Sequence, residues 1–334
     1  MSRKNGYVLL PHPVREEAVE ILENEDIEVV LAEKPDISII APLIKKARAV
    51  ILRTGAEMDR ELLEKADDLR TISRTGVGVD NVDLEAATEK GVVVTSSLGV
   101  NTSSVAEHCM ALILGLTKKL FLLDKETRTS NFKVRYQYYP QDIKGKRLGV
   151  VGFGRIGQKV AGYFQIMSGK KIFAFDPLLP EEIKREFEEK VVFVTLEKLL
   201  KKSDIVSLHV PLNSNTEGLI GMEELETMGS DAFIVNVARG GVINEGDLIE
   251  ALQKGIIGGA ALDVFQKEPP EKDNPLLEMN NVILTPHAAA LTEECVVRMA
   301  TAAAERVISV LQGNKPENIA NPEVLSDDRW QHLE

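Results

Sequence analysis

The sequence contains few cysteines and no long apolar run. Among its 334 residues only Cys109 and Cys295 are cysteines, and neither has a neighbour at metal-ligand spacing, so we expect no disulfide framework and no metal site. A reduced, cytoplasmic compartment is the simplest expectation. No stretch reaches the roughly 18 apolar residues of a membrane helix. The first residues lack the apolar core of a signal peptide, so we expect no membrane attachment.

A surplus of basic charge is also missing. The chain carries 52 acidic and 40 basic side chains, a net charge of −12, and no basic stripe. This balance argues against nucleic acid as a partner. An anionic ligand must therefore be held by local donors, such as Arg239 and backbone N–H groups.

Apolar runs of strand length alternate with segments of helical period, which indicates parallel α/β units. The first series predicts strands at Tyr7–Leu10, Glu28–Ala32, Ala49–Arg53, Thr71–Arg74 and Val92–Thr95. Helical patterns lie between them, and one long helix is expected from Ser103 to about Lys125. The polar and aromatic segment Asn131–Lys146 is expected to be a connecting arm.

A second series begins at Arg147 and ends in a helix at Glu293–Leu311, with Gly313 as its stop. Its strands are expected at Leu148–Gly152, Lys171–Asp176, Val191–Thr195, Ile205–Val210, Phe233–Val237, Gly259–Val264 and Val282–Thr285. The polar tail that follows should return to the first series or fray. We therefore predict two doubly wound α/β domains. A Rossmann domain (residues 102–290) is inserted into a flavodoxin-like substrate domain (1–101 and 291–334).

A glycine-rich segment, Gly152-Phe153-Gly154-Arg155-Ile156-Gly157, follows the first strand of the second series and opens a helix. Gly152 permits a tight turn, Gly154 lets the backbone approach a pyrophosphate, and Gly157 lets the helix pack on the sheet. Asp176 stands 19 residues after Gly157, near the spacing for a ribose acceptor. The alternative is an ordinary βα turn. Because Asp176 would repel a 2′-phosphate, NAD is favoured over NADP.

Three polar residues follow strands further along the chain. Arg239 can pair with a carboxylate through both arms of its guanidinium, and His287 is suited to acid–base work because histidine titrates near about pH 6.5. A carboxylate such as Glu268 would favour the imidazolium and orient its ring. Taken singly, each has a plain alternative as a surface arginine, a loop histidine or a solvated acid. Together they predict hydride exchange at a 2-keto or 2-hydroxy acid.

The first series offers further donors for a substrate carboxylate. The glycine-rich loop Arg74–Asn81 contains Val77 and Gly78, whose backbone N–H groups can face an anion. Arg53 ends another strand and is a candidate for the same task. A plain βα turn and an ordinary surface charge are the respective alternatives, and the role of Arg74 stays open.

These residues, in this order, resemble the D-isomer-specific 2-hydroxyacid dehydrogenases, particularly the D-3-phosphoglycerate and hydroxypyruvate/glyoxylate branches. The resemblance implies NAD as cofactor, Arg239, Glu268 and His287 as the catalytic set, and a homodimer built on the long helix. Substrate contacts are implied for Arg53, Val77, Gly78 and Arg239. Cofactor contacts are implied for Val77, Gly152, Gly154, Arg155, Ile156, Gly157, Asp176, Val210, Pro211, Val237, Asp263 and His287. Asp263 is expected near the nicotinamide carboxamide.

Some positions depart from that family. The chain ends soon after its last helix, so no C-terminal regulatory domain is expected. Ala288–Ala290 follow His287 where relatives often carry glycine. Glu268 replaces the glutamine of formate dehydrogenases, which argues against that activity.

The expected function is an NAD-dependent dehydrogenase that interconverts a D-2-hydroxy acid and its 2-keto acid. Glyoxylate, hydroxypyruvate and 3-phosphohydroxypyruvate are the substrates considered. An NADH-sensing corepressor-like binding protein and a phosphite dehydrogenase are the alternatives. The sequence leaves open the substrate, the physiological direction and the role of Tyr136, Tyr138 and Tyr139.

Overall fold

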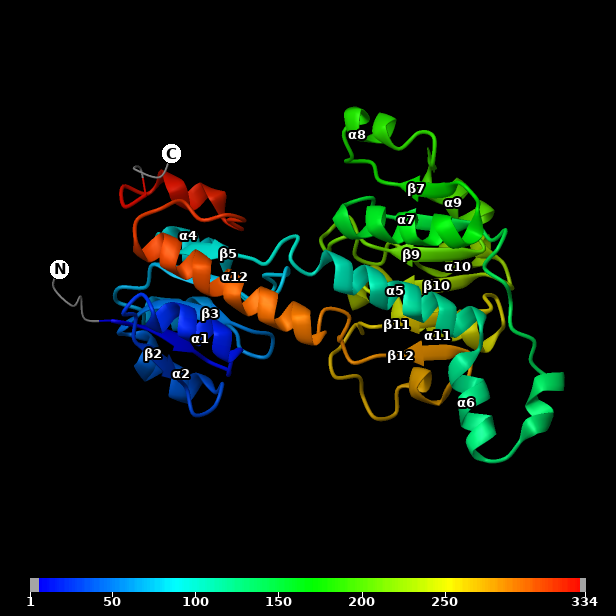
Figure 1. Cartoon of the computed structure of the whole chain (residues 1–334), viewed down its shortest axis with the longest axis horizontal. Coiled ribbons are helices and arrows are strands. Elements are labelled where there is room, and N and C mark those ends of the chain that lie inside the picture. The colour runs from blue at the N-terminus through cyan, green and yellow to red at the C-terminus, as the bar shows by residue number, and fades with distance from the viewer. Residues whose placement is uncertain (1–5, 331–334) are drawn as a thin grey trace. The chain divides into compact units, whose positions relative to one another are not determined.

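The structure is a computed structural model that describes residues 6–330. The chain forms two compact units (Figure 1). Met1–Asn101 and Leu291–Glu334 form unit 1, and Thr102–Ala290 form unit 2. Unit 2 is therefore inserted in sequence between the two parts of unit 1.

Unit 1 contains a parallel sheet of five strands in the order β2-β1-β3-β4-β5, which is the order of flavodoxin-like folds. Its strands are β1 (Tyr7–Leu10), β2 (Val29–Leu31), β3 (Ala47–Leu52), β4 (Thr71–Arg74) and β5 (Val93–Thr95). Its helices are α1 (Glu16–Glu23), α2 (Ile37–Ile44), α3 (Arg60–Glu64), α4 (Leu84–Glu89), α12 (Glu293–Leu311) and the short η4 (Pro322–Ser326).

Alternating strand residues fill the two faces of this sheet. Leu9 and Val50 belong to a buried cluster with α2, α3 and α4. Val8 and Ile51 belong to another cluster with α1 and α12. Because both faces are covered, the strands are apolar along their whole length. That is why short continuous apolar runs predicted them correctly.

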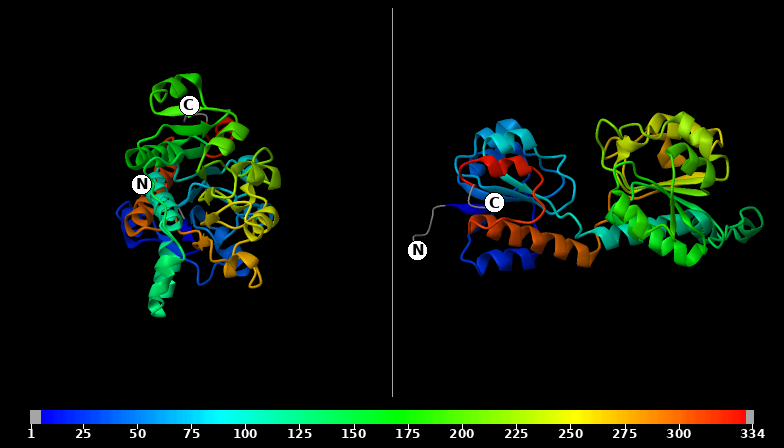
Figure 2. Two further views of the ribbon diagram at one scale, coloured as in Figure 1. Left: turned by 90° about the vertical axis from the view of Figure 1, so that its right-hand side faces the viewer. Right: turned by 90° about the horizontal axis from the view of Figure 1, so that it is seen from above.

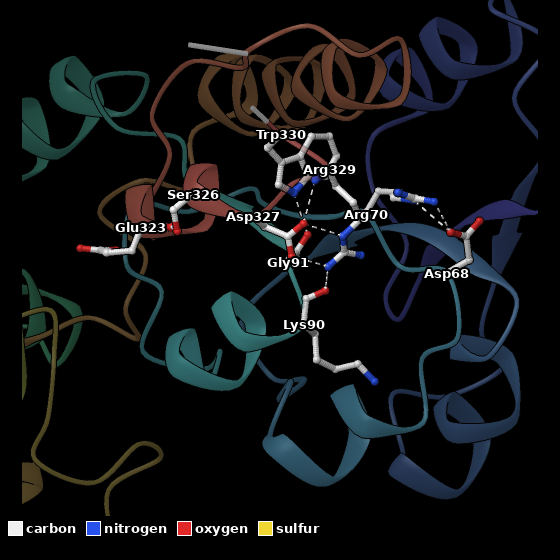
Figure 3. Close-up of polar contacts among 9 residues, drawn as sticks. All are labelled: Asp68, Arg70, Lys90, Gly91, Glu323, Ser326, Asp327, Arg329 and Trp330. Atoms are coloured by element: carbon white, nitrogen blue, oxygen red, sulfur yellow. Dashed lines mark hydrogen bonds and ion pairs between the residues drawn. The ribbon is translucent and has the colours of Figure 1, made fainter. Parts of the chain in front are cut away.

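The C-terminal tail returns to unit 1 and covers the edge of its sheet at β5. Ala320 donates its backbone N–H to Val94 (2.7 Å), and the Asn321 side chain accepts from the Val94 N–H (2.8 Å). The indole N–H of buried Trp330 donates to the Gly91 carbonyl (2.8 Å), as Figure 3 shows. Arg329 donates to the Lys90 carbonyl beside it. An edge that would otherwise expose unpaired backbone groups is thereby covered.

Unit 2 contains a parallel sheet of seven strands in the order β12-β11-β10-β9-β6-β7-β8. The strands are β6 (Leu148–Val151), β7 (Ile172–Phe175), β8 (Val191–Phe193), β9 (Ile205–Leu208), β10 (Phe233–Asn236), β11 (Gly259–Leu262) and β12 (Val282–Leu284). The α-helices are α5 (Thr102–Thr117), α6 (Leu120–Arg128), α7 (Arg155–Ser168), α8 (Glu181–Glu186), α9 (Leu196–Lys202), α10 (Met222–Met228) and α11 (Glu245–Gln253). Short 3-10 turns are η1 (Phe132–Tyr136), η2 (Gly240–Val242) and η3 (Pro275–Glu278).

Helices cover both faces of this sheet (Figure 2). Residues of α5 and α7, such as Cys109 and Phe164, pack on one face with Val150. Leu225 of α10 and Leu248 of α11 pack on the other face. The strand order reverses between β6 and β9, where the loops that follow the strands diverge. Ligands of open α/β sheets bind at this point.

The predicted fold class and strands are confirmed, with ends that differ by one or two residues. The prediction of one long helix from Ser103 to Lys125 is wrong. Lys119 adopts a left-handed φ of 51°, which ends α5 before α6 begins at Leu120. The Gln141 N–H also bonds to the Thr117 carbonyl (2.8 Å), which a continuing helix would use itself. Within residues 6–330, no helix is long and apolar enough to cross a membrane.

Trp330 is the only tryptophan of the chain, so it both stabilises and reports on the tail. We predict that Trp330→Ala lowers the free energy of unfolding by about 3–5 kcal/mol, since it leaves a cavity against β5. Trp330→Phe, the matched control, keeps an aromatic ring there and loses the bond to Gly91 with part of the packing, so it should cost less than Trp330→Ala. Calorimetry measures both, and equal stability of Trp330→Ala and the wild type would contradict the packing described.

Candidate active site

The glycine-rich loop after β6 requires glycine at two of its three glycine positions. Gly152 has a φ of +89°, and a Cβ there would lie 2.6 Å from the carbonyl oxygen of His209. A Cβ at Gly157 would lie 2.2 Å from the Gly152 carbonyl oxygen, so α7 packs directly on the loop. A Cβ at Gly154 would meet no protein atom within 4 Å. The space at Gly154 is thus left free at the N-terminus of α7, where backbone N–H groups attract a phosphate.

Asp176 follows β7 and touches the glycine loop. Its carboxylate accepts hydrogen bonds from the backbone N–H groups of Phe153 (2.8 Å) and Leu178 (3.0 Å). The structure therefore brings this acid beside Gly154, in the position where dinucleotide-binding folds place the ribose acceptor. Val210 also borders the loop, because a Cβ at Gly152 would lie 2.9 Å from its Cγ1.

The remaining cofactor candidates lie on the same loops. Arg155 opens α7 and is exposed, while Ile156 is half-buried against the core. The Pro211 carbonyl accepts from the Thr216 hydroxyl (2.5 Å), and Val237 is buried after β10. The structure thus gathers these side chains at the carboxyl edge of the sheet.

His287 and Glu268 lie on the loops after β12 and β11. His287 Nδ1 is 2.8 Å from Glu268 Oε2, and the other carboxylate oxygen accepts from the Phe265 N–H (3.1 Å). An ionised carboxylate can only accept, so Nδ1 carries a hydrogen and Nε2 is left to exchange a proton. The His287 side chain is 43% exposed, which leaves Nε2 accessible to a ligand.

Glu268 is ionised for a definite physical reason. Burial by itself would raise the pKa of Glu268, but the hydrogen bond and charge of His287 lower it. The N–H of Phe265 and the charge of Arg239 act in the same direction, and the pKa ends below its ordinary value. At neutral pH the residue is therefore a carboxylate next to His287.

Arg239 stands at the end of β10 in a tightly held loop. The Asn236 side chain accepts from the Ala238 N–H (3.0 Å) and donates to the Arg239 carbonyl (2.8 Å). A Cβ at Gly240 would lie 1.9 Å from the Phe265 carbonyl, so this loop packs against the one that carries Glu268. Backbone contact between the two loops brings the arginine and the acid to one edge of the sheet.

Asp263 is 1% exposed, and its carboxylate faces the His287 loop. It accepts from the N–H groups of Ala288 (2.8 Å) and Ala289 (2.9 Å) and from the Thr285 hydroxyl (2.6 Å). The Asp263 carbonyl accepts from the His287 N–H (2.7 Å). These bonds hold His287 in a left-handed conformation, with a φ of 51°. Sequence reasoning missed this anchoring, because no signal in one sequence pairs Asp263 with a loop so far along the chain.

The other described histidines are in different surroundings. Burial lowers the pKa of His209 to about 3, so its ring is neutral at ordinary pH. Its Nε2 lies 2.8 Å from the Ser207 hydroxyl. Burial and then the charge of Arg53 lower the pKa of His12. His108 contacts Thr285 (3.1 Å), and His332 lies outside the described residues.

The candidates in unit 1 lie at the ends of its own strands. Arg53 is exposed after β3 and donates to the Pro13 carbonyl (2.7 Å). Arg74 is buried and donates to the Gly78 carbonyl (2.9 Å). Arg74 therefore supports the loop that contains Val77 and Gly78, which answers a question that the sequence left open.

In the part of the chain that the structure describes, no three His, Cys, Asp or Glu side chains form a group that could hold an ion. Both cysteines are buried free thiols, and burial raises the pKa of Cys109 to about 12.

Fold and loop geometry together define a dinucleotide-binding α/β protein, and comparison with known proteins gives its family. The model of the D-isomer specific 2-hydroxyacid dehydrogenase NAD-binding domain matches residues 110–289. The chain belongs to the D-isomer-specific 2-hydroxyacid dehydrogenase family.

Three relatives illustrate the similarity. D-3-phosphoglycerate dehydrogenase of Methanocaldococcus jannaschii is 41% identical over 94% of this chain, which spans 59% of that relative's length. Glyoxylate reductase of Korarchaeum cryptofilum is 38% identical over 87% of this chain and 88% of its own length. The D-lactate dehydrogenase of Aquifex aeolicus, solved with NAD and lactic acid, superposes with a TM-score of 0.82. It is 29% identical, over 96% of this chain and 97% of that one.

A nicotinamide cofactor fits the residues of unit 2 and is supported by the family match. The open space at Gly154 and the N-terminus of α7 suit a pyrophosphate, and the Asp176 carboxylate suits a ribose hydroxyl. The residues present therefore fit the group that the family implies.

The glycine loop gives a matched pair of variants. Gly154→Ala should raise the Kd for NADH about tenfold or more, since the methyl group occupies free space needed by a phosphate, with Tm within about 2 °C of wild type. Gly157→Ala should lower both affinity and Tm, because its Cβ meets the Gly152 carbonyl. Titration calorimetry and thermal unfolding separate the two. Unchanged NADH binding by Gly154→Ala would contradict the assignment.

Proposed function

We propose that this protein is an NAD-dependent dehydrogenase that interconverts a D-2-hydroxy acid and its 2-keto acid. The observation that carries the proposal is the hydrogen bond between His287 and ionised Glu268 (2.8 Å). This pair lies at the same sheet edge as the glycine loop and Arg239. Family membership supports the reaction class.

In the proposed mechanism His287 is the acid–base residue. When bound, the nicotinamide supplies or accepts the hydride at the substrate carbon. The developing charge on the substrate oxygen takes its proton from His287 Nε2, because Nδ1 is engaged with Glu268. The Glu268 carboxylate stabilises the imidazolium and fixes its orientation. In the opposite direction His287 removes the hydroxyl proton.

Arg239 is proposed to bind the substrate carboxylate, since its guanidinium can pair with both oxygens. Further contacts are proposed for the backbone N–H groups of Val77 and Gly78 and for Arg53. Val77, Asp263 and His287 are also proposed to border the nicotinamide. Arg155, Ile156, Val210, Pro211 and Val237 would line the rest of the cofactor.

The proposed substrates are small 2-keto acids: glyoxylate, hydroxypyruvate or 3-phosphohydroxypyruvate. Two of them correspond to activities named for relatives, glyoxylate reductase and D-3-phosphoglycerate dehydrogenase. NAD is proposed over NADP, because the negative charge of Asp176 beside the glycine loop would repel a 2′-phosphate.

We also propose a homodimer, supported by apolar side chains on a projecting segment of unit 2. In Figure 1, α6 and the segment after it extend away from the sheet. Phe121, Phe132, Tyr136 and Tyr139 are each more than 60% exposed there, and clustered exposed aromatic side chains often mark an interface. Sedimentation of the wild type as a monomer would refute this. A cytoplasmic location is proposed from the two free thiols.

The test of function is NADH oxidation with each of the three keto acids. We expect turnover with at least one, a lower kcat/KM with NADPH, and a loss of about 10²–10⁴ in kcat for His287→Asn while NADH still binds. Lys254→Ala, an exposed partner of Glu250, is the control. Wild-type turnover by His287→Asn would contradict the proposed mechanism.

Glu268 predicts a pH effect with a definite sign. Its lowered pKa extends the charged form to pH values below the ordinary range of a glutamate, so at neutral pH the carboxylate is fully charged beside His287. In Glu268→Gln the charge next to His287 is lost, and the fall of keto-acid reduction with rising pH should move to lower pH. Profiles of kcat/KM against pH measure the shift. Glu271→Gln, an exposed acid on the same loop, should leave the profile in place.

A further inference from the structure

His108 is a histidine of unit 2 to which the proposed mechanism gives no task. It lies on α5, which packs against β10, β11 and β12, and its side chain is 24% exposed. Its Nε2 is 3.1 Å from the Thr285 hydroxyl and 3.6 Å from Asp263 Oδ1. Thr285 stands two residues before His287. His108 is therefore joined to the loop that carries the proposed acid.

The direction of each hydrogen bond in this cluster follows from the number of hydrogens available. Thr285 has one hydroxyl hydrogen, and the Asp263 carboxylate, 2.6 Å away, can only accept it. The Thr285 oxygen must then accept from His108, so His108 Nε2 carries a hydrogen. Two hydrogen bonds therefore link the three residues: His108 donates to Thr285, and Thr285 donates to Asp263.

Asp263 accepts the last of these hydrogen bonds and also holds the loop that carries His287. Besides Thr285, its carboxylate takes the N–H groups of Ala288 and Ala289. A left-handed φ at a residue other than glycine persists only where its surroundings enforce it, and His287 has a φ of 51°. The direction in which the carboxylate points thus decides where the His287 ring stands.

We propose that His108 is a positioning residue, which fixes the His287 ring through Thr285 and the Asp263 carboxylate. The proposal rests on the proposed function, since it concerns the geometry of the acid–base residue. His108 donates one N–H to Thr285, and that bond directs the Thr285 hydroxyl at Asp263 rather than at another acceptor. A helix on the outer layer of the sheet thereby sets the geometry of a loop at its carboxyl edge.

The test compares two substitutions at position 108. His108→Leu removes the donor and should lower kcat by about 10- to 100-fold, the usual cost of a displaced catalytic group, with little change in the Kd for NADH. His108→Gln places an amide N–H near the position of Nε2 and should restore kcat to within about threefold of wild type. Glu107→Gln, exposed on the same turn, is the matched control.

A second variant guards against a purely structural effect. Thr285→Val removes the hydroxyl that links His108 to Asp263. If both residues act through this link, the double variant with His108→Leu should lose no more kcat than the more impaired single variant. Equal kcat for His108→Leu and wild type would overturn the proposal, as would a His108→Gln as slow as His108→Leu. The proposal would also be overturned if the losses of kcat in Thr285→Val and His108→Leu multiplied in the double variant.

The failure of this proposal is distinguishable from that of the proposed function. If His287→Asn keeps full turnover, the proposed function fails at its acid–base residue. If His287→Asn is inactive and His108→Leu is fully active, only the role of His108 fails. In a His287→Asn background, His108→Leu should leave the residual rate unchanged, because there is no imidazole to position.

Discussion

The site of unit 2 depends on one buried carboxylate. Asp263 is almost fully enclosed, and a charge in that position is tolerated only where donors surround it. Three of its donors, the Thr285 hydroxyl and the Ala288 and Ala289 N–H groups, come from the segment that contains His287. Without the carboxylate, the Ala288 and Ala289 N–H groups would lose their partner, at about 1–3 kcal/mol for each one left buried. The charge of Asp263 and the strained conformation of His287 therefore stabilise each other.

Close backbone approach is the second constraint. The loop after β6 meets the loop after β9 at Gly152, and α7 meets its own loop at Gly157. The loop after β10 meets the loop after β11 at Gly240. A parallel sheet places these loops along one edge, but only glycine lets them come so near. Arg239 reaches the neighbourhood of Glu268 because Gly240 lies against the Phe265 carbonyl. The parallel sheet places the loops along one edge, and the glycines let neighbouring loops lie close enough for their side chains to surround a small anion.

Much of this arrangement could be predicted from the chain itself, because both sheets are covered on both faces and their strands are continuous apolar runs. Residues directly after such runs must lie at the carboxyl edge, which is how Arg239, His287 and Asp176 were singled out. The break at Lys119 could not be predicted, since neither of its direct neighbours is glycine or proline and a lysine rarely adopts a left-handed φ. The contacts of Asp263 with Thr285, and of Thr285 with His108, depend on packing between distant segments. No local pattern encodes them.

Three of the described histidines differ in what their imidazole rings can do, because their surroundings differ. His209 is buried without a carboxylate, so its pKa falls to about 3 and its ring serves only as a neutral hydrogen-bonding group. His108 has its Nε2 hydrogen committed to Thr285. His287 alone of these three has an ionised carboxylate on one nitrogen and an accessible nitrogen on the other. A ring so placed can hold a proton and release it, and its residue keeps a left-handed φ of 51° because the Asp263 carboxylate holds the N–H groups that follow it. Strain of this kind, retained beside a charged pair, is typical of functional sites, where the surroundings enforce a conformation that a free chain would leave.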